Sequence, residues 1–254
     1  MDATAPVVLT RPAGRNAGLA HALQAAGLAV IDAPALAIER LDTPLPPLLP
    51  GDLCVFVSRQ AVDACCGSRA GRDWLRETRV AAVGAATAQA LLAHVPAARI
   101  LAPGPDVPPD SESLLAVMDA AGLQPGRAHI LRAQQGRDWL ACQLQARGWT
   151  VACHAVYRRS PVGWDRAVCT QVAAASGCTM LLTSAEAVEA VTDSLQRHGL
   201  DWPSVLRVVT LHERIVRRLQ CVYAERPAGG LVVRLSAPDE AALFQAILAS
   251  ARSA

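Results

Sequence analysis

Hydrophobic residues along the chain follow two patterns that alternate. Short apolar runs rich in valine, leucine and isoleucine predict buried strands. These runs lie at Val7–Arg11, Leu28–Ile31, Leu53–Val57, Arg79–Val83, Arg99–Ala102, Thr150–Tyr157, Thr179–Thr183, Leu206–Thr210 and Cys221–Ala224, and a further run ends in Arg132. Between them, segments with apolar residues three or four positions apart predict helices, for example Arg15–Ala26, Arg137–Arg147 and Ser184–His198. Buried strands that alternate with helices predict an α/β fold built on doubly wound parallel sheets.

The segment Ile130–Arg159 is the clearest strand–loop–helix–strand unit. Its first strand ends in Arg132, a tight loop follows, and Gly148 is a natural stop for the helix that begins near Arg137. This order places both arginines and the loop amides at the carboxyl edge of a parallel sheet, where open α/β sheets bind ligands. Such a site suits a carboxylate or a phosphate. The alternative is that these arginines are ordinary solvated residues.

The chain is predicted to form two domains, one inserted in the other. The pattern Ser-x-x-Ala-Val occurs at Ser58–Val62 and again at Ser184–Val188, each time after a buried run. The first strands lack enough partners for a sheet, and so does the C-terminal half, so we expect them to combine around the middle of the chain. The predicted parts are residues 1–37 with 162–254 for the first domain, 42–156 for the second, and 38–41 with 157–161 for two linker strands that pair, near Glu39 and Arg158.

Charge and residue usage narrow the chemistry. All 24 basic residues are arginine, which excludes a Schiff-base lysine and a P-loop lysine. The net charge is +2 and the arginines are dispersed, so nucleic-acid binding is not predicted. The eight cysteines show no CxxC or Cys/His spacing, which favours reduced thiols in a cytoplasmic protein without a metal site. The acidic N-terminus is unlike a signal peptide, and the uncharged stretch Val80–Ala98 contains proline and polar residues, so no membrane association is expected.

Small hydroxyl residues recur where a predicted strand gives way to a helix. They are Ser58, Thr87, Ser111, Thr183 and Ser184. Each suits the N-cap of a helix. Hydroxyls and amides at such turns also suit an anionic ligand, and the two roles are compatible.

Several short motifs occur in a specific order along the chain. They are Thr10-Arg11-Pro12, Phe56-Val57-Ser58-Arg59-Gln60-Ala61-Val62, Val83-Gly84-Ala85-Ala86-Thr87-Ala88, Ser111-Glu112-Ser113-Leu114-Leu115, Arg132-x-x-x-Gly136-Arg137-x-x-Leu140, Val156-Tyr157-Arg158 and Thr183–Val188. Together they resemble the uroporphyrinogen-III synthases. The resemblance spans nearly the whole chain and implies two HemD-type α/β domains, the second inserted in the first, joined by a two-strand ladder.

The resemblance also implies a reaction. Hydroxymethylbilane, a linear tetrapyrrole with acetate and propionate arms, is cyclised with loss of water and inversion of ring D to uroporphyrinogen III, in haem biosynthesis. This substrate closes unaided to the wrong isomer, so the enzyme must mainly hold one geometry. We expect no cofactor, a monomer in the cytoplasm, and no protein partner other than a transient contact with hydroxymethylbilane synthase.

The resemblance assigns roles to individual residues. Tyr157 is expected to assist departure of the substrate hydroxyl as a general acid or hydrogen-bond donor, the alternative being a linker tyrosine that only packs. The residues expected to bind the substrate are Arg11, Ser58, Gly84, Thr87, Ser111, Arg132, Gly136, Arg137, Thr183, Ser184, Thr210 and Arg214. The chain departs from the family where a second Gly-x-x-Thr is expected and Thr210–Arg214 stands instead. We expect Thr210 and Arg214 to supply the same contacts; otherwise the first domain's share of the site is weaker.

Two other classes of protein fit part of the pattern. A non-catalytic two-domain protein that closes on an anionic metabolite needs similar turns and arginines, and turnover of hydroxymethylbilane distinguishes the two. A sugar-nucleotide transferase also has two doubly wound domains, but these usually follow one another and the chain is usually longer.

Overall fold

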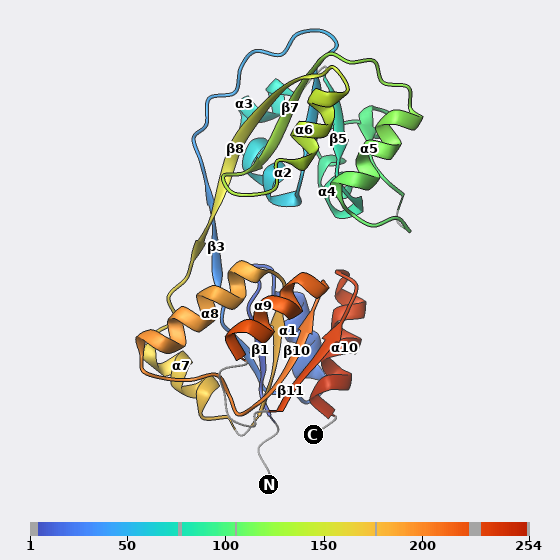
Figure 1. The fold of residues 1–254 in the computed structure, drawn as a ribbon. Coiled ribbons are helices and arrows are strands. Elements are labelled where there is room, and N and C mark those ends of the chain that lie inside the picture. The colour runs from blue at the N-terminus through green and yellow to red at the C-terminus, as the bar shows by residue number, and fades with distance from the viewer. Residues whose placement is uncertain (1–4, 76–77, 105, 176, 224–229, 253–254) are drawn as a thin grey trace. The chain divides into compact units, whose positions relative to one another are not determined.

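The computed structural model describes residues 5–75, 78–104, 106–175, 177–223 and 230–252 (Figure 1). The chain forms two compact units. Unit 1 comprises Met1–Ala37 and Ser160–Ala254, and unit 2 comprises Ile38–Arg159. The predicted α/β class, with one parallel-sheet domain inserted in another, is confirmed. Within the described ranges every helix is too short or too polar to cross a bilayer.

Unit 1 is a five-stranded parallel sheet in the order β11-β10-β9-β1-β2. Its strands are β1 (Val7–Leu9), β2 (Val30–Asp32), β9 (Cys178–Leu182), β10 (Val205–Thr210) and β11 (Gly230–Leu235). Its helices are α1 (Ala17–Ala25), α7 (Arg166–Ala173), α8 (Ala185–Arg197), α9 (Glu213–Tyr223) and α10 (Glu240–Arg252).

Alternate residues of each strand in unit 1 supply two separate cores. Val8 and Met180 pack against α7, α8 and α9. Val7 and Leu181 lie on the other face and pack against α1 and α10. Burial of both faces explains why these strands are continuous apolar runs rather than alternating ones.

At the end of unit 1 one predicted strand was wrong and one observed strand was not predicted. The predicted strand Cys221–Ala224 is helical up to Tyr223, where the described residues of α9 end. Its apolar residues continue the four-residue spacing of α9, and Tyr223 is buried with Leu219 in the core. The strand that completes the sheet is β11, which was not predicted and lies at the sheet edge with Val232 exposed.

Unit 2 is a six-stranded sheet in the order β3-β8-β7-β4-β5-β6. Neighbouring strands from β8 to β6 in this order are parallel. The strands are β3 (Leu36–Arg40), β4 (Leu53–Phe56), β5 (Arg79–Ala82), β6 (Ile100–Leu101), β7 (Arg127–Ala133) and β8 (Thr150–Pro161). The helices are α2 (Arg59–Cys66), α3 (Arg69–Trp74), α4 (Ala85–Leu91), α5 (Ser111–Ala120) and α6 (Trp139–Ala146), with a 3₁₀ turn at Ala97–Arg99. One core lies against α2 and α4, and the other against α5 and α6.

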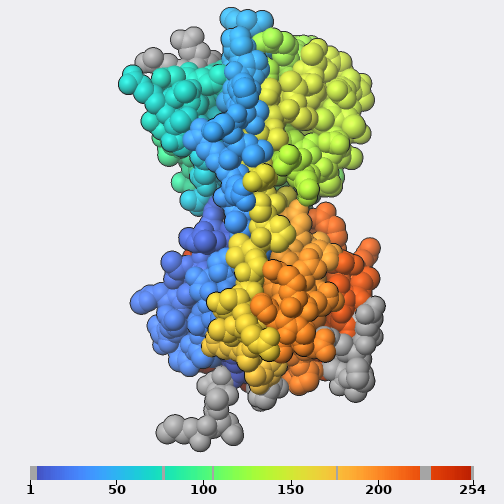
Figure 2. Space-filling view, turned by 90° about the vertical axis from the view of Figure 1, so that its left-hand side faces the viewer, coloured from blue at the N-terminus to red at the C-terminus, as the bar shows by residue number. Residues whose placement is uncertain are grey.

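The two segments in which the chain crosses between the units lie next to each other as β3 and β8. Leu41 N donates to Val156 O at 3.0 Å, and Val162 N donates to Ala35 O at 2.9 Å. Figure 2 shows the two segments side by side. Each crossing therefore satisfies part of the other's backbone hydrogen bonding.

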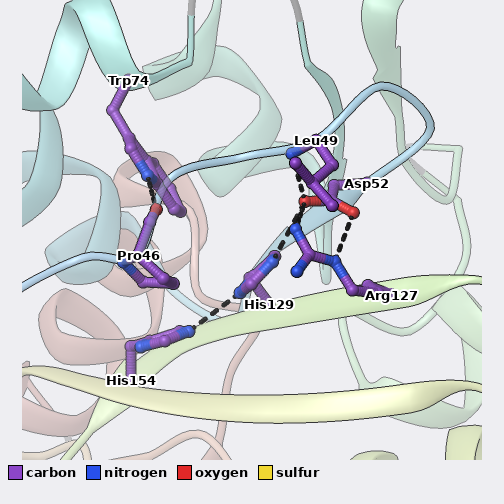
Figure 3. Close-up of polar contacts among 7 residues, drawn as sticks. All are labelled: Pro46, Leu49, Asp52, Trp74, Arg127, His129 and His154. Carbon is purple, nitrogen blue, oxygen red and sulfur yellow. Dashed lines mark hydrogen bonds and ion pairs between the residues drawn. The ribbon is translucent and has the colours of Figure 1, made fainter.

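A partly buried polar cluster lies where β4 and β7 begin and reaches His154 on β8 (Figure 3). Asp52 accepts two hydrogen bonds from Arg127, at 2.9 and 2.5 Å, and one from Leu49 N at 2.7 Å. Arg127 in particular lowers the pKa of Asp52 to about 2. His129 lies between Asp52 and His154, with Nε2 3.4 Å from Asp52 Oδ2 and Nδ1 3.0 Å from His154 Nε2. This cluster links the start of β4 to β7, and β7 to β8.

Candidate functional site

The carboxyl edge of the unit 2 sheet brings together the turns that follow β4, β5 and β7. Phe56 is level with Ala82 on one side and with Leu131 on the other. The backbone continues this alignment past the strand ends, since Val83 N donates to Phe56 O at 3.1 Å and Val57 N to Leu131 O at 3.3 Å. Polar residues placed directly after these strands therefore lie along one edge.

Ser58 and Tyr157 meet at this edge. Ser58 caps α2, and its Oγ accepts from Ala61 N at 3.2 Å. The Tyr157 hydroxyl lies 3.0 Å from the same Oγ. Tyr157 is 3% exposed and its ring belongs to the core beside α2, whereas Ser58 is half-buried. The sequence singled out both residues but not their contact.

A β-bulge in β8 directs Tyr157 toward α2. The pairing with β7 shifts between Arg132 and Ala133, so that Arg132 is opposite Ala155 but Ala133 is opposite Tyr157. Val156 is the additional residue, and both it and Tyr157 are buried in the same core. Without the bulge, neighbouring strand residues would point to opposite faces.

The turn after β5 requires glycine. Gly84 precedes α4, and a Cβ at this position would lie 2.5 Å from Pro109 Cβ. Thr87 follows in the first turn of α4 with its side chain buried, and its backbone N–H donates to Gly84 O at 3.0 Å. The close approach of Pro109 brings the loop before α5 against this turn.

The loop after β7 is closed by Arg132. Its Nη2 donates to Gly136 O at 2.7 Å, its Nε to Ala133 O at 3.3 Å, and its Nη1 pairs with Asp138. The side chain is only 12% exposed. Arg132 therefore stabilises the conformation of its own loop. The sequence had predicted only a contact with the substrate for this residue.

Arg137 projects from the same loop and is the more accessible arginine. Its side chain is 57% exposed, and Nη1 lies 3.2 Å from Glu112 Oε1 in the first turn of α5. Ser111 is the first residue of that helix, while the N-cap is Asp110, which accepts from Ser113 N at 2.8 Å. The loop after β7 and the start of α5 thus form one surface.

Unit 1 carries the remaining predicted residues at its own carboxyl edge. Arg11, two residues after the end of β1, donates to Asn16 Oδ1 at 3.1 Å and lies 3.3 Å from Glu240 Oε1. Asn16 is fully buried and also donates to Asp32 Oδ1 at 2.6 Å. The sequence did not indicate Asn16 or Glu240 as partners of Arg11, because neither belongs to a motif.

The other unit 1 residues differ in exposure. Ser184 caps α8 and accepts from Ala187 N at 3.1 Å, with half-buried Thr183 before it. Thr210 is fully buried, and its Oγ1 has no hydrogen-bond partner among the residues that the structure describes. Arg214 is exposed in the first turn of α9.

His212 takes over the capping role at the start of α9. Its Nδ1 accepts from Arg214 N at 3.0 Å, and its carbonyl accepts from Ile215 N at 2.9 Å. A side-chain acceptor at this position does what a Ser or Thr N-cap does elsewhere. The departure Thr210–Arg214 therefore preserves the helix start, although Gly-x-x-Thr is absent.

The predicted residues thus fall into two sets. Unit 2 groups Ser58 with Tyr157, Gly84 with Thr87, and Arg132 and Gly136 with the Arg137–Ser111 surface, while Arg11, Thr183, Ser184, Thr210 and Arg214 belong to unit 1. Across the described ranges, His, Cys, Asp and Glu nowhere form a group of three that could hold a metal ion. The polar groups in these two sets are hydroxyls, backbone amides and guanidinium groups.

Comparison with known proteins finds relatives with the same architecture. A family model described as uroporphyrinogen-III synthase HemD matches residues 17–223. A mutant uroporphyrinogen III synthase from the extremely thermophilic bacterium Thermus thermophilus has a similar structure, with 18% identity, a TM-score of 0.51 and coverage of 98% of this chain and 100% of that one. The uroporphyrinogen-III synthetase of Helicobacter pylori gives 12% identity, a TM-score of 0.51 and coverage of 96% and 99%. The structural matches establish the fold, and because the family model spans well over half of the sequence, the chain belongs to the uroporphyrinogen-III synthase HemD family.

Proposed function

We propose that this chain carries out the reaction of its family at the turns described above. Hydroxymethylbilane loses its terminal hydroxyl as water, ring D attacks through its substituted carbon, and the macrocycle closes to uroporphyrinogen III. The observation that carries the proposal is the contact of the Tyr157 and Ser58 hydroxyls at 3.0 Å, on the sheet edge that also carries Arg137. A hydroxyl pair on the same sheet edge as an exposed guanidinium suits departure of a hydroxyl from a substrate held by its carboxylates.

Arg137 is proposed to bind a substrate carboxylate. Its present partner, Glu112, is 45% exposed, so the pair is weak in water. A substrate carboxylate, held at the same time through its other arms, can replace Glu112 on the guanidinium. Backbone N–H groups at the starts of α2 and α5 are proposed to bind further carboxylates.

Unit 1 is proposed to contribute through the start of α8, at Thr183 and Ser184, and through Arg11 and Arg214. Arg214 carries a positive charge near the N-terminus of α9, where the helix dipole already favours an anion. Thr210 is proposed to act through its position beneath this turn, because its side chain is fully buried.

A coupled assay tests the function. Porphobilinogen and its deaminase generate hydroxymethylbilane, the chain is added without any cofactor, and the oxidised product isomers are separated. We expect mainly isomer III. Formation of isomer I alone would contradict the activity and favour the alternative of a protein that only binds an anionic tetrapyrrole.

We further propose that the protein acts in the cytoplasm as a monomer that receives its substrate from hydroxymethylbilane synthase in a transient contact. Each unit has its own hydrophobic core, which supports a self-sufficient monomer. Sedimentation at assay concentration, alone and with the synthase, tests both points. A stable dimer would contradict the first, and an isomer ratio independent of the synthase concentration would contradict the second.

A further inference from the structure

The hydrogen bond between the Ser58 and Tyr157 hydroxyls could run in either direction, and the chemistry of the two groups and their neighbours favours one. A serine hydroxyl has one proton to donate and two lone pairs to accept with. Ala61 N–H can only donate, so its 3.2 Å contact occupies one lone pair of Ser58 Oγ. The remaining question is whether Tyr157 donates to Ser58 or accepts from it.

The acidity of the two hydroxyls favours donation by Tyr157. A phenol titrates near pH 10 and gives up its proton far more readily than an aliphatic alcohol, so it is the stronger donor. With Tyr157 as donor, both lone pairs of Ser58 Oγ are occupied, at 3.0 and 3.2 Å. The Ser58 proton is then the only part of that hydroxyl still available to a ligand.

The two residues also differ in exposure, and the difference again favours Ser58 as the residue that meets a ligand. Tyr157 is 3% exposed, and the bulge at Val156 turns its ring into the core. Ser58 is half-buried at the beginning of α2. Of the two residues, Ser58 is therefore the one on the surface of unit 2.

We infer that Ser58 meets the departing hydroxyl of the substrate and that Tyr157 is a positioning residue that acts through it. This inference rests on the proposed function and reverses the roles that the sequence suggests. Two accepted hydrogen bonds draw electron density from Ser58 Oγ and make its proton a better donor.

The reaction step balances without a net change in the protein. The C–O bond of the hydroxymethyl group breaks and its electron pair leaves on oxygen, while electrons of the pyrrole ring form the exocyclic double bond. The oxygen takes up one proton from solvent and departs as water, and the pyrrole N–H releases one proton to solvent. Ser58 donates a hydrogen bond to the oxygen as negative charge develops on it.

A double-mutant cycle tests the inference, with kcat and KM for isomer III measured separately. Ser58→Ala should lower kcat about 100-fold, as for loss of one hydrogen-bond donor to the developing negative charge. Tyr157→Phe should lower kcat about tenfold, as for loss of one hydrogen bond. Because Tyr157 acts through Ser58, the double variant should match Ser58→Ala within a factor of about two, with KM little changed and most activity restored in Ser58→Thr.

Two matched variants control for stability. Ser68→Ala removes another unit 2 cap, in which Ser68 Oγ accepts from Gly71 N at 3.1 Å. Tyr223→Phe removes the hydroxyl of the other tyrosine, which donates to Pro203 O at 2.9 Å. Both should keep kcat within a factor of about two, since their losses are of stability only.

The possible outcomes separate the inference from the function. The inference would be overturned if the decreases in kcat of the two single variants multiply in the double variant, or if Tyr157→Phe lowers kcat more than Ser58→Ala does. In either case the wild-type chain would still form isomer III. A wild-type chain that forms only isomer I would overturn the proposed function and the inference with it.

Discussion

Arg158 donates two hydrogen bonds to Glu39 Oε2, from Nε at 2.8 Å and from Nη2 at 2.6 Å. Glu39 lies on β3, through which the chain leaves unit 1, and Arg158 lies on β8, through which it re-enters unit 1. Their side chains are 51% and 41% exposed. The pair therefore helps to specify which residues of the two crossing strands lie next to each other, but it adds only a small free energy of folding.

A double-mutant cycle on this pair should give a small coupling. Replacing Glu39 and Arg158 by alanine, singly and together, should give a coupling of about 0.5 kcal/mol in urea unfolding, smaller at high salt. Arg59 and Asp63, an exposed pair within α2, provide a comparison. A coupling above about 2 kcal/mol, or one insensitive to salt, would show that solvent does not screen the pair.

Arg137→Ala should weaken binding rather than chemistry. Loss of a charge-assisted contact to a carboxylate corresponds to about 1.5 to 3 kcal/mol, or roughly a ten- to 100-fold rise in KM with little change in kcat. Arg147→Ala is the matched control, because Arg147 is also a partly exposed arginine paired with a carboxylate, Asp119, but follows the end of α6. Unchanged saturation kinetics in Arg137→Ala would exclude the contact.

Gly84→Ala should disturb the turn after β5. The added Cβ would overlap Pro109, whose Cβ is 2.5 Å and whose Cα is 3.1 Å from the ideal position. We expect a loss of about 1 to 3 kcal/mol in the free energy of unfolding, as in other overpacked sites. Gly126→Ala is the control, because its Cβ would meet no atom closer than 3.9 Å. Equal stability of the two variants would show that Pro109 can move away freely.

His154 should make unit 2 sensitive to acid. Burial, together with the neighbouring His129, lowers the pKa of His154 below its usual 6.5. The unfolded chain then binds the proton more readily than the folded one, so the stability contributed by neutral His154 is complete above about pH 6.5 and is lost as the pH falls below it. The loss for one histidine cannot exceed about 1.4 kcal/mol per pH unit.

Urea unfolding at pH 7 and pH 5 measures this effect. His154→Gln removes the titrating group while its amide can still hydrogen-bond to His129. The free energy of unfolding should therefore differ less between pH 7 and pH 5 in this variant than in the wild type. His94→Gln removes an exposed histidine of the same unit and should leave the difference unchanged. An equal difference in wild type and His154→Gln would show that His154 is not the responsible group.

Local features of the fold were predictable because they depend on residues close together in sequence. Ser58 and Ser184 cap their helices as expected, since a cap needs only the amide three residues further on. Gly148 ends α6 with φ at +85°, a conformation that glycine adopts without the strain of a side chain. The failures also have a local cause, since Cys221–Tyr223 has strand-forming residues but continues the apolar stripe of α9.

The sequence by itself determined the alternation of strands and helices, the serine caps of α2 and α8, and the set of polar residues at the strand ends. Only the tertiary structure decided which of these residues touch. Tyr157 reaches Ser58 because a bulge opposite Ala133 shifts the strand register, and no pattern in β8 announces that shift. Arg132 and Arg137 look alike in sequence, yet one braces its loop and the other is exposed. The physical reason is that capping and periodicity act over about four residues, whereas partners such as Ser58 and Tyr157 are 99 residues apart and meet only when the whole sheet is in register.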